Sequence, residues 1–413
     1  MNDEADGERR IGTREAAALL GVKPATVYAY VSRGQLASRR EAVGRGSTFD
    51  AREVEELARR SRREAAGRSP AGEPSVRTSL TLIEPDRYYF RGVDAVELAS
   101  RHRYEEVAEF LWTGTLVPGA RFTAPPGPLT AARRVVAALP EHAGPIDMLR
   151  VATAAAAVAD PLRFDLSPEA VLGSARCLVP TLVGALPTVR TGPRGNGPLA
   201  RDLWHRLTAR EPDGASLHTL DLALALLVDH DLAASTLAVR VAASARAHPY
   251  AAVSAGLGAL EGPLHGVAGR LAHRMLTEAL ERGGAAPVVA DHLRAGRRVP
   301  GLGHRLYRGE DPRATALFAR LEALPHAAPA LAAAREVVAT AAGRRPGLHA
   351  NVDLALAVLT VSCGMPAEAG ETVFAVARTA GWIAHALEEY GERPLRMRPS
   401  GHYDGPRPPR PLP

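Results

Sequence analysis

Hydrophobic residues recur with the spacing of α-helices along most of the chain. Residues 131–240 form amphipathic or fully apolar runs of Ala, Leu and Val that Pro and Gly interrupt, which predicts a succession of helices. Residues 220–228 carry apolar side chains on every face and predict a fully buried helix. Further apolar runs predict a long helix at 349–359 and an amphipathic helix at 376–389. We therefore expect a mainly α-helical protein.

Shorter patterns precede these helices. Residues 75–90 alternate between polar and apolar positions and predict short strands, followed by helices at 96–101 and 104–112. Residues 61–74 are rich in Arg, Gly, Pro and Ala, a composition typical of a linker. Residues 1–8 are acidic, and we expect them to be a disordered tip. The chain therefore divides into a small N-terminal part and a large helical part.

The N-terminal part begins with signals for two short helices. Thr13 can cap a helix that ends before Gly21, and Pro24 suits the first turn of a second helix ending near Ser32. The sequence thus predicts a helix, a tight turn and another helix.

A hairpin and a third helix are expected next. Residues 35–40 and 47–49 flank a glycine-containing stretch at 43–46, which predicts the tip of a hairpin. Residues 50–53, Asp-Ala-Arg-Glu, have the form of a capping box and predict a helix to about Arg60.

The composition is that of a globular chain with a large core. The 413 residues exceed one typical domain, and 46% are hydrophobic while 23% are charged. Aromatic residues make up only 5%, so aliphatic side chains and Ala must build that core. High Ala and Leu content also favours helices over strands.

Cysteine content and hydropathy bear on the compartment. Cys177 and Cys363 are too few for a disulfide framework or a Cys-rich zinc site, so we expect free thiols in a reducing cytoplasm. No apolar run approaches the ~20 residues that cross a membrane, and the N-terminus lacks the apolar core of a signal peptide. We therefore expect a cytoplasmic protein without a membrane partner.

Arginine supplies nearly all of the positive charge. Lys23 is the only lysine among 51 basic residues, so a Gly-Lys-Ser/Thr phosphate loop is absent, as is any Schiff-base lysine after residue 23. Arginine must therefore hold any anionic substrate, and its planar, permanently charged fork suits carboxylates and phosphates. Residues 9–70 hold 14 basic and 7 acidic side chains, so the net positive charge is concentrated there.

Three polar segments interrupt the Ala- and Leu-rich sequence of the helical part. They are Gly-Pro-Leu-His-Gly around His265, Pro-Gly-Leu-Gly-His-Arg-Leu-Tyr around His304, and Asn-Val-Asp ending at Asp353. One carboxylate and two imidazoles can remove a proton next to a carbonyl, stabilise the enolate oxygen and activate an electrophile. The spacing alone leaves open that all three are structural residues at helix ends.

In this order, the segments resemble the citrate synthase signature GP-x-HG, G-x-GHR-x-Y…DPR and NVD. The sequence around His230, Arg378 and Arg398 matches as well, so the resemblance covers about residues 75–399. It implies a citrate synthase-like fold and a homodimer in which two subunits build each site. The implied parts are a large helical domain (75–265 and 376–399) and a small helical domain (266–375). Residues 400–413 are rich in Pro and Arg, and we expect a flexible tail there.

The resemblance also implies a reaction, in which acetyl-CoA, oxaloacetate and water give citrate and free CoA. Asp353 would take a proton from the thioester methyl group, His265 would hydrogen-bond the thioester oxygen, and His304 would polarise the ketone. The implied carboxylate ligands are His230, Arg313, Arg378 and, from the partner subunit, Arg398. The implied CoA-binding residues are Pro300, Gly301, Leu302 and Gly303. No metal or cofactor is implied, because Arg and His supply the positive field.

Two positions depart from the family pattern. Ala233 and Gly269 stand where the family has Asn near the oxo-acid, so two hydrogen-bonding side chains are missing. Three alternatives therefore stay open beside citrate synthesis. They are a 2-methylcitrate synthase that uses propionyl-CoA, a metabolite-sensing transcriptional regulator with a weak site, and an oligomeric scaffold with a decayed site.

The N-terminal residues 9–60 resemble a winged helix-turn-helix of the excisionase and MerR type. The resemblance implies that the second helix enters the major groove of DNA and that the hairpin contacts phosphates. The candidate DNA-binding residues are Lys23, Tyr28, Arg33, Arg39, Arg40 and Arg45. A solvated basic face or a protein-docking module is the alternative.

Overall fold

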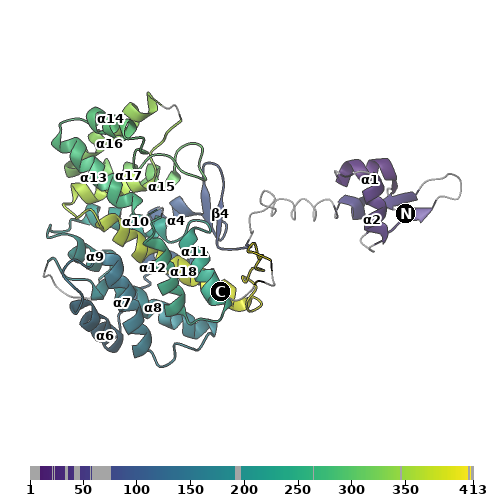
Figure 1. Cartoon of the computed structure of the whole chain (residues 1–413), viewed down its shortest axis with the longest axis horizontal. Helices are drawn as coiled ribbons and strands as arrows, with labels where there is room; N and C mark the ends of the chain where they lie inside the picture. Colours follow the sequence, from purple (N-terminus) through teal and green to yellow (C-terminus); the bar gives the residue numbers. More distant parts are fainter. Residues whose placement is uncertain are drawn as a thin grey trace, which may run out of the picture. The chain divides into compact units, whose positions relative to one another are not determined.

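The chain forms two compact units, Met1–Arg77 and Thr78–Pro413 (Figure 1). The computed structural model describes residues 10–20, 22, 24–32, 36–40, 47–55, 57, 76–190, 197–263, 265–344, 347–407 and 410. The tip expected at 1–8 and the linker expected at 61–74 lie outside these residues.

Two short helices open the N-terminal unit. α1 spans Thr13–Leu20 and α2 spans Pro24–Ser32, which confirms the predicted helix pair. The helices pack on each other, and Ala16 and Val27 are buried in their common core. Small and β-branched side chains thus fill the contact between them.

A three-stranded antiparallel sheet completes this unit. β3 (Ser47–Asp50) pairs with β2 (Arg39–Arg40), which confirms the predicted hairpin, whose tip at 43–46 lies outside the described residues. β3 also pairs with β1 (Arg10–Gly12), and Ile11 lies opposite Phe49 in that register. The sequence did not predict β1, because three residues are too few to show an alternating pattern.

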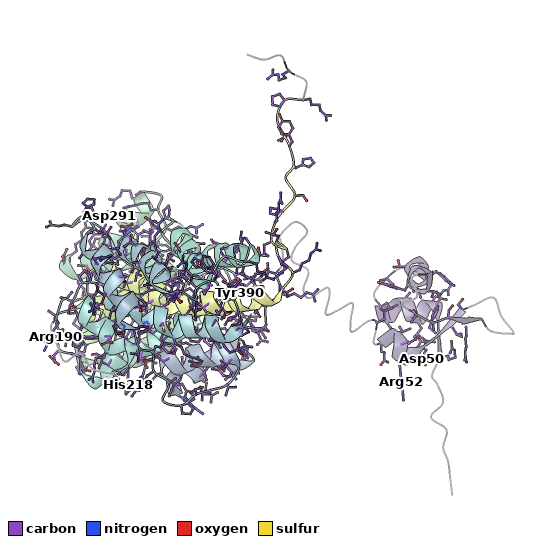
Figure 2. The ribbon with its side chains drawn as sticks, turned by 90° about the horizontal axis from the view of Figure 1, so that it is seen from below. Asp50, Arg52, Arg190, His218, Asp291 and Tyr390 are labelled. Atoms are coloured by element: carbon purple, nitrogen blue, oxygen red, sulfur yellow. The ribbon has the colours of Figure 1, made fainter. Side chains whose placement is uncertain are left out.

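Asp50 ends β3 and caps the next helical segment. Its Oδ1 accepts a hydrogen bond from Arg52 N at 2.8 Å, and residues 51–55 are helical. Figure 2 labels Asp50 and Arg52 on this unit. The Glu53 carboxylate accepts a hydrogen bond from Ala37 N at 3.1 Å. This contact joins the helical segment to the chain that precedes β2.

The second unit begins with a small antiparallel sheet, as the alternation at 75–90 predicts. Tyr88 and Phe90 are buried, and their rings meet edge to face at 5.4 Å. Asp94 accepts a hydrogen bond from Glu97 N at 2.9 Å and caps the first helix. In order, the elements are β4 (Thr81–Ile83), β5 (Tyr88–Phe90), β6 (Val93–Asp94) and α4 (Ala95–Arg101).

The rest of the unit is helical, which confirms the expectation of a mainly α fold. Helices α6, α7, α8, α11 and α12 pack in one group, while α13, α14, α16 and α17 pack in another (Figure 1). The helices are α5 (Tyr104–Thr113), α6 (Pro126–Ala137), α7 (Pro145–Ala159), α8 (Pro168–Ala185), α9 (Leu199–Leu207), α10 (Gly214–Leu227), α11 (Ala234–Ser244), α12 (Pro249–Leu260), α13 (Ala268–Glu281), α14 (Ala285–Arg294), α15 (Pro312–Leu321), α16 (Ala328–Ala342), α17 (Val352–Ser362) and α18 (Ala369–Gly391), with a 3-10 turn η1 (Pro325–Ala327).

Helix α18 contacts both groups of helices. It packs on α8, α11 and α12 and also on α13 and α17. Every residue from Ala375 to Ala386 is buried, so the prediction of an amphipathic helix at 376–389 was wrong. Neighbours surround the helix, so its central polar side chains are buried rather than exposed. At Gly381 a Cβ would overlap Val228 O, so only glycine permits this close approach to the end of α10.

Two further expectations concern the cysteines and membrane-spanning helices. The thiols of Cys177 and Cys363 are free. Among the described residues, no helix is both long enough and apolar enough to span a membrane.

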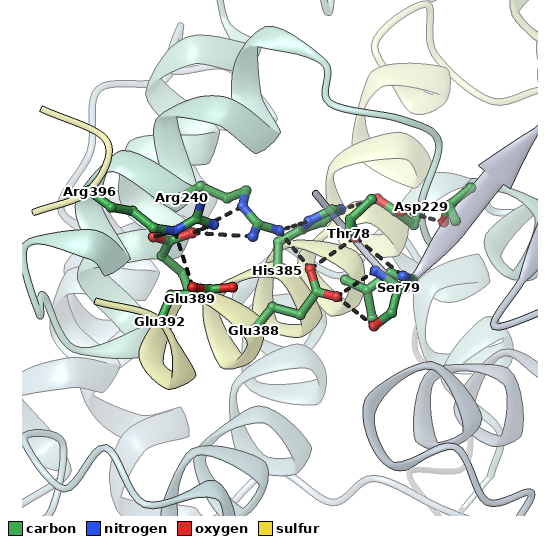
Figure 3. Close-up of polar contacts among 11 residues, drawn as sticks. Thr78, Ser79, Asp229, Arg240, His385, Glu388, Glu389, Glu392 and Arg396 are labelled. Carbon is green, nitrogen blue, oxygen red and sulfur yellow. Dashed lines mark hydrogen bonds and ion pairs between the residues drawn. The ribbon is translucent and has the colours of Figure 1, made fainter. Parts of the chain in front are cut away.

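A buried polar network fixes the C-terminal half of α18 (Figure 3). Arg240 of α11 is 1% exposed, and its guanidinium lies 2.7 Å from the Glu388 carboxylate and 3.2 Å from that of Glu389. Arg396 donates two hydrogen bonds to Glu389, at 2.8 and 2.6 Å. Arg240 also contacts His385 Nδ1 at 2.8 Å. Since an arginine can only donate, this nitrogen accepts, and the His385 proton resides on Nε2.

The same network reaches the start of the unit and the end of α10. Glu388 accepts hydrogen bonds from Thr78 Oγ1 and Ser79 N at 2.9 and 2.7 Å. His385 Nε2 donates to Asp229 Oδ1 at 3.2 Å, and Thr81 Oγ1 donates to the other Asp229 oxygen. The chain at residues 78–81 and the turn after α10 are therefore held by one set of charges.

Two buried carboxyl groups lie where α5 meets α10. Burial, with the nearby Glu105 carboxylate, raises the pKa of Asp221 to about 7. Asp221 Oδ1 accepts a hydrogen bond from Tyr104 N at 3.4 Å, and Glu105 Oε1 accepts one from Leu199 N at 3.0 Å. The Asp221 pKa exceeds the value of ~3.9 expected in the unfolded chain. The protonated Asp221 carboxyl is therefore compatible with the folded state at low pH. This contribution to the free energy of unfolding is lost as the pH rises through about 7.

We expect Arg240→Met to destabilise the protein strongly. Removal of the cation leaves the buried Glu389 carboxylate with less compensation, which costs about 3–5 kcal/mol. Urea unfolding of the full chain measures the change. Arg335→Met is the matched control, because its ion pair with Glu322 is mostly exposed and is worth about 0–1 kcal/mol. Equal effects of the two substitutions would contradict the account.

Asp221→Asn tests the buried carboxyl pair. The amide imitates the protonated acid at every pH, so the variant should gain stability relative to the unmodified chain as the pH rises from 5 to 8. The measurement is the difference in thermal unfolding midpoint between the two proteins across this range. A difference that stays constant with pH would rule out titration of Asp221 near 7.

Candidate active site

The three polar segments converge on one pocket of the second unit. The pocket has a volume of ≈ 690 Å³. Its lining includes the three catalytic candidates, His265, His304 and Asp353. It also includes the carboxylate-binding candidates His230, Arg313 and Arg378.

His265 lies in the turn between α12 and α13. Its backbone N donates to Gly262 O at 2.9 Å, which closes the turn. Its Nε2 lies 2.7 Å from Ser235 Oγ, which belongs to the first turn of α11. Burial and the positive charge of Arg378 lower the pKa of His265, so the ring is neutral at pH 7. A neutral ring that accepts from Ser235 at Nε2 carries its proton on Nδ1.

Asp353 lies in the first turn of α17. Asn351 caps the helix, since its Oδ1 accepts from Asp353 N at 3.0 Å while its Nδ2 donates to Gly303 O at 2.9 Å. No described residue hydrogen-bonds to the Asp353 carboxylate, and burial raises the pKa of Asp353 to about 6. A carboxylate without donors is a stronger base than a solvated one, which suits removal of a proton from carbon.

Arg313 lies in the first turn of α15 and is fixed by Asp311. Asp311 Oδ1 accepts from Arg313 Nε at 3.0 Å, and Oδ2 accepts from Arg313 Nη2 at 2.8 Å. Asp311 Oδ2 also accepts from Val352 N at 3.1 Å. Although burial opposes it, the Arg313 charge lowers the pKa of Asp311, so the carboxylate stays ionised. One carboxylate thus positions both Arg313 and the start of α17.

His304 has two neighbouring donors and one acceptor nitrogen. Leu306 N lies 3.1 Å from Nδ1, and Arg313 Nη2 lies 3.3 Å from Nε2. Burial and the Arg313 charge lower the pKa of His304 to about 4, so the ring is neutral at pH 7. A neutral imidazole accepts at one nitrogen only, so it satisfies one of these donors at a time.

His230 lies in the sharp turn after α10. The next residue, Asp231, has φ 59°, a left-handed conformation that Asp adopts more readily than most residues. His230 Nε2 lies 2.8 Å from Tyr307 Oη. Burial and the charges of Arg313 and Arg378 keep the pKa of His230 well below its usual value. The ring is therefore a neutral hydrogen-bonding group between two cations.

Arg378 lies near the middle of α18 and is 1% exposed. Its Nε donates to Leu227 O at 2.9 Å, and its guanidinium carbon lies 4.5 Å from the centre of the Phe374 ring. Burial lowers the pKa of Arg378 to about 10, which leaves it charged at pH 7. No described residue hydrogen-bonds to its Nη groups, so they can bind an anion.

A second pocket of ≈ 760 Å³ adjoins the first, and both are lined by Gly303, His304 and Arg305. Among the CoA-binding candidates, Leu302 and Gly303 line it, whereas Pro300 and Gly301 do not. Its lining also includes the arginines Arg297, Arg298, Arg305 and Arg344. The pocket is therefore strongly basic.

The loop of the CoA-binding candidates is tied to the segment before α17. Gly301 O accepts from Asn351 N at 2.9 Å, and Gly303 N donates to His349 O at 2.8 Å. The Gly303 amide is therefore already engaged by the backbone. Gly301 has φ 78°, and a Cβ there would collide with Leu354 Cβ at 2.8 Å. Glycine therefore lets the loop that precedes His304 approach the first turn of α17 closely.

The remaining candidates lie elsewhere. Arg398 is exposed and lines neither pocket of its own chain. Tyr28 is 48% exposed, with its Oη 3.2 Å from Thr13 Oγ1, and Arg39 is exposed on β2. Lys23, Arg33, Arg45 and the side chain of Arg40 lie outside the described residues.

The sequence interpretation missed four residues that orient the candidates. Ser235 contacts His265, Tyr307 contacts His230, Asp311 holds Arg313, and Asn351 caps the helix of Asp353. All four lie inside the matched motifs, which was the available signal. Their roles depend on contacts between segments far apart in the chain, which spacing does not reveal.

Comparisons with known protein families match both units. The family "Citrate synthase, C-terminal domain" matches residues 70–400. The family "Helix-turn-helix domain" matches residues 11–62. The two matches together span most of the chain.

Individual relatives agree with these matches. The citrate synthase of Haloferax volcanii is 33% identical over 353 residues, which cover 79% of this chain and 93% of that protein. The crystal structure of citrate synthase from Pyrobaculum aerophilum has a TM-score of 0.68 at 27% identity, covering 82% of this chain and 92% of that one. The ternary complex of citrate synthase from Thermoplasma acidophilum with carboxymethyl coenzyme A and oxaloacetate shares the fold, with a TM-score of 0.66 at 24% identity over 82% of this chain and 96% of that one. The chain therefore belongs to the citrate synthase family of acyl-transferring condensing enzymes and carries an N-terminal helix-turn-helix domain.

Proposed function

We propose that the protein condenses acetyl-CoA with oxaloacetate and water to give citrate and free CoA. The observation that carries this proposal is the pocket that Asp353, His265 and His304 line together with Arg313 and Arg378. It combines a base, hydrogen-bond donors for a carbonyl and cations for carboxylates, which this condensation requires. The Thermoplasma acidophilum enzyme of the same fold binds oxaloacetate and a CoA derivative.

In the first step, Asp353 takes a proton from the thioester methyl group. This carbon acid is much weaker than a carboxylic acid, so the oxygen of the forming enolate needs a donor. Nδ1–H of His265 supplies it, because the Ser235 hydroxyl occupies Nε2. The unpaired Asp353 carboxylate is the base with which the reaction starts.

In the second step, the enolate carbon attacks the ketone carbon of oxaloacetate. An oxo-acid carboxylate that binds Arg313 releases Nε2 of His304 from the guanidinium. The ring then accepts from Leu306 N at Nδ1 and donates Nε2–H to the ketone oxygen. That proton passes to the new alkoxide, and the proton held by Asp353 returns to His304 through solvent. Water then cleaves the thioester to a carboxylate and the CoA thiol.

The oxo-acid is held by charge from several elements. Arg313 and Arg378 bind its carboxylates, with His230 as a neutral donor between them. The partner subunit's Arg398 completes the clamp in a homodimer, and these cations make a metal or cofactor unnecessary. The helices of residues 266–375 act as the small domain that closes on the bound oxo-acid.

The basic pocket beside the site binds the CoA nucleotide. Its four arginines match the phosphate groups of CoA, and Leu302 offers an apolar contact to the adenine ring. Gly303 and His304 line both pockets, so the thioester arm passes along them toward Asp353. Pro300 and Gly301 do not line this pocket, and their role is to hold the loop against the segment before α17, where Gly301 O accepts from Asn351 N.

Asp353→Asn should lower the rate of CoA thiol release from acetyl-CoA and oxaloacetate by at least about 10²-fold. In the unmodified chain, kcat/KM should rise with pH through about 6 and then level, because only the ionised carboxylate is a base. Asp291→Asn, an exchange on α14 outside the pocket, is the matched control and should keep full activity. Unchanged turnover in Asp353→Asn would disprove the assignment.

We also propose that the N-terminal unit binds DNA. Residues 11–62 match the helix-turn-helix family, and residues 9–70 carry an excess of basic side chains. Tyr28 on α2 and Arg39 on β2 are exposed and can contact a duplex. The neighbouring candidates Lys23, Arg33, Arg40 and Arg45 add to the positive field.

Arg39→Ala should weaken DNA binding and reduce its salt dependence. One lost phosphate contact lowers the slope of log affinity against log salt by about 1. Fluorescence anisotropy with a labelled duplex and the full chain measures this slope between 50 and 200 mM salt, a range in which phosphate contacts dominate. Arg335→Ala in the second unit is the control. Absence of binding at the lowest salt would exclude the proposal.

A further inference from the structure

Glu371 is a buried carboxylate in the active-site pocket that the reaction described above does not use. It lies in the first turn of α18 and is 8% exposed, and it lines the same pocket as His265 and Asp353. No described residue hydrogen-bonds to its carboxylate. Its place near the helix N-terminus explains why a negative charge is tolerated there. It does not supply the donors that a buried carboxylate needs.

Two glycines that line this pocket, Gly266 and Gly269, lie beside Glu371 and Asp353. A Cβ on Gly269 would lie 3.7 Å from Asp353 Oδ1 and 3.8 Å from Glu371 N. Gly266, next to His265, would place a Cβ 3.0 Å from Glu371 Oε1. Glu371, Asp353 and His265 line one pocket, and Gly269, which lines it too, has room for no more than a methyl group at ordinary contact distance from Asp353.

The surrounding charges decide what can fill this space. Burial raises the pKa of Glu371, the Arg270 charge opposes this, and Glu368, Glu261 and Asp147 reinforce it. An anionic group would be repelled by these carboxylates. A purely apolar group would leave the Glu371 oxygens without a donor, a cost of about 1–3 kcal/mol for a buried polar group and more for a charged one. A ligand group that donates a hydrogen bond to the Glu371 carboxylate avoids both of these costs.

We propose that Glu371 and Gly269 adapt this pocket to an acyl-CoA whose acyl chain carries a hydroxyl or amino donor beyond the reacting carbon. Glu371 accepts the hydrogen bond, and Gly269 provides the room. The inference rests on the proposed condensation and names a class of acyl substrate that the same site accepts besides acetyl-CoA.

The chemistry of the step is unchanged for such a substrate. With the donor on carbon 3, carbon 2 still carries the proton that Asp353 removes. Carbon 2 then bonds to the ketone carbon of the oxo-acid, and the alkoxide takes the His304 proton. Water cleaves the thioester, which gives a carboxylic acid and the CoA thiol. No oxidant or reductant is needed.

The test compares 3-hydroxypropionyl-CoA, 3-aminopropionyl-CoA, propionyl-CoA and acetyl-CoA, each with oxaloacetate and the full-length protein. We expect kcat/KM for at least one donor-bearing substrate to exceed that for propionyl-CoA by about tenfold or more, since a site built around a hydrogen bond rejects analogues that lack it. Preference for the hydroxyl or the amino compound identifies the donor.

Variants of the two residues sharpen the test. Glu371→Leu should abolish the preference for a donor, whereas Glu371→Gln should keep a preference for the hydroxyl and lose any for the amine. Gly269→Ala should lower the ratio of 3-hydroxypropionyl-CoA to acetyl-CoA turnover, because its Cβ fits at ordinary contact distances and fills the shared space. A preference for propionyl-CoA, or a ratio that Glu371→Leu leaves unchanged, would overturn the proposal.

Failure of this inference can be told apart from failure of the proposed condensation. Absence of CoA release with every thioester would refute the condensation alone, because equilibrium dialysis still measures binding of the same thioesters. In that case a tighter Kd for 3-hydroxypropionyl-CoA than for propionyl-CoA, lost in Glu371→Leu, supports the inference. Equal Kd values refute it. Turnover of acetyl-CoA without any donor preference refutes the inference and leaves the condensation intact.

Discussion

The paired contact between Asp311 and Arg313 is the constraint on which the site depends. The same carboxylate accepts two hydrogen bonds from the guanidinium and a third from Val352 N at the start of α17. It therefore sets the distance between the cation for the oxo-acid and the helix that carries Asp353. Without it, the buried Arg313 would lack this counter-charge, and Val352 N would lose its acceptor.

Burial and nearby charges give the titratable groups of the pocket different protonation states, and therefore different roles. Burial lowers the pKa values of His230, His265 and His304. Arg378 adds to this shift at His265, Arg313 at His304 and both arginines at His230, so all three rings are neutral donors or acceptors. Burial raises the pKa of Asp353 to about 6, so it is mostly ionised at pH 7 and still basic. In this pocket the permanently charged groups are Arg313 and Arg378, which bind the substrate carboxylates. Proton transfer is carried out by the imidazole rings and the Asp353 carboxylate.

Much of the fold and the choice of candidate residues followed from the sequence. The apolar runs predicted the helices, and the three polar segments singled out His265, His304 and Asp353, which line one pocket. The failures share one cause, because each depended on contacts between distant segments. Helix α18 is buried on all sides because helices from both groups surround it, which its own pattern does not show. The contacts of Ser235 with His265 and of Glu371 with the pocket arise in the same way.

The central claim is that one pocket joins a thioester carbon to an oxo-acid carbon. The most direct measurement is the quantification by mass spectrometry of citrate and free CoA formed from acetyl-CoA and oxaloacetate. The account predicts that the purified protein forms both products in equal amounts. Release of CoA without citrate would show a hydrolase instead, and formation of neither product would contradict the account.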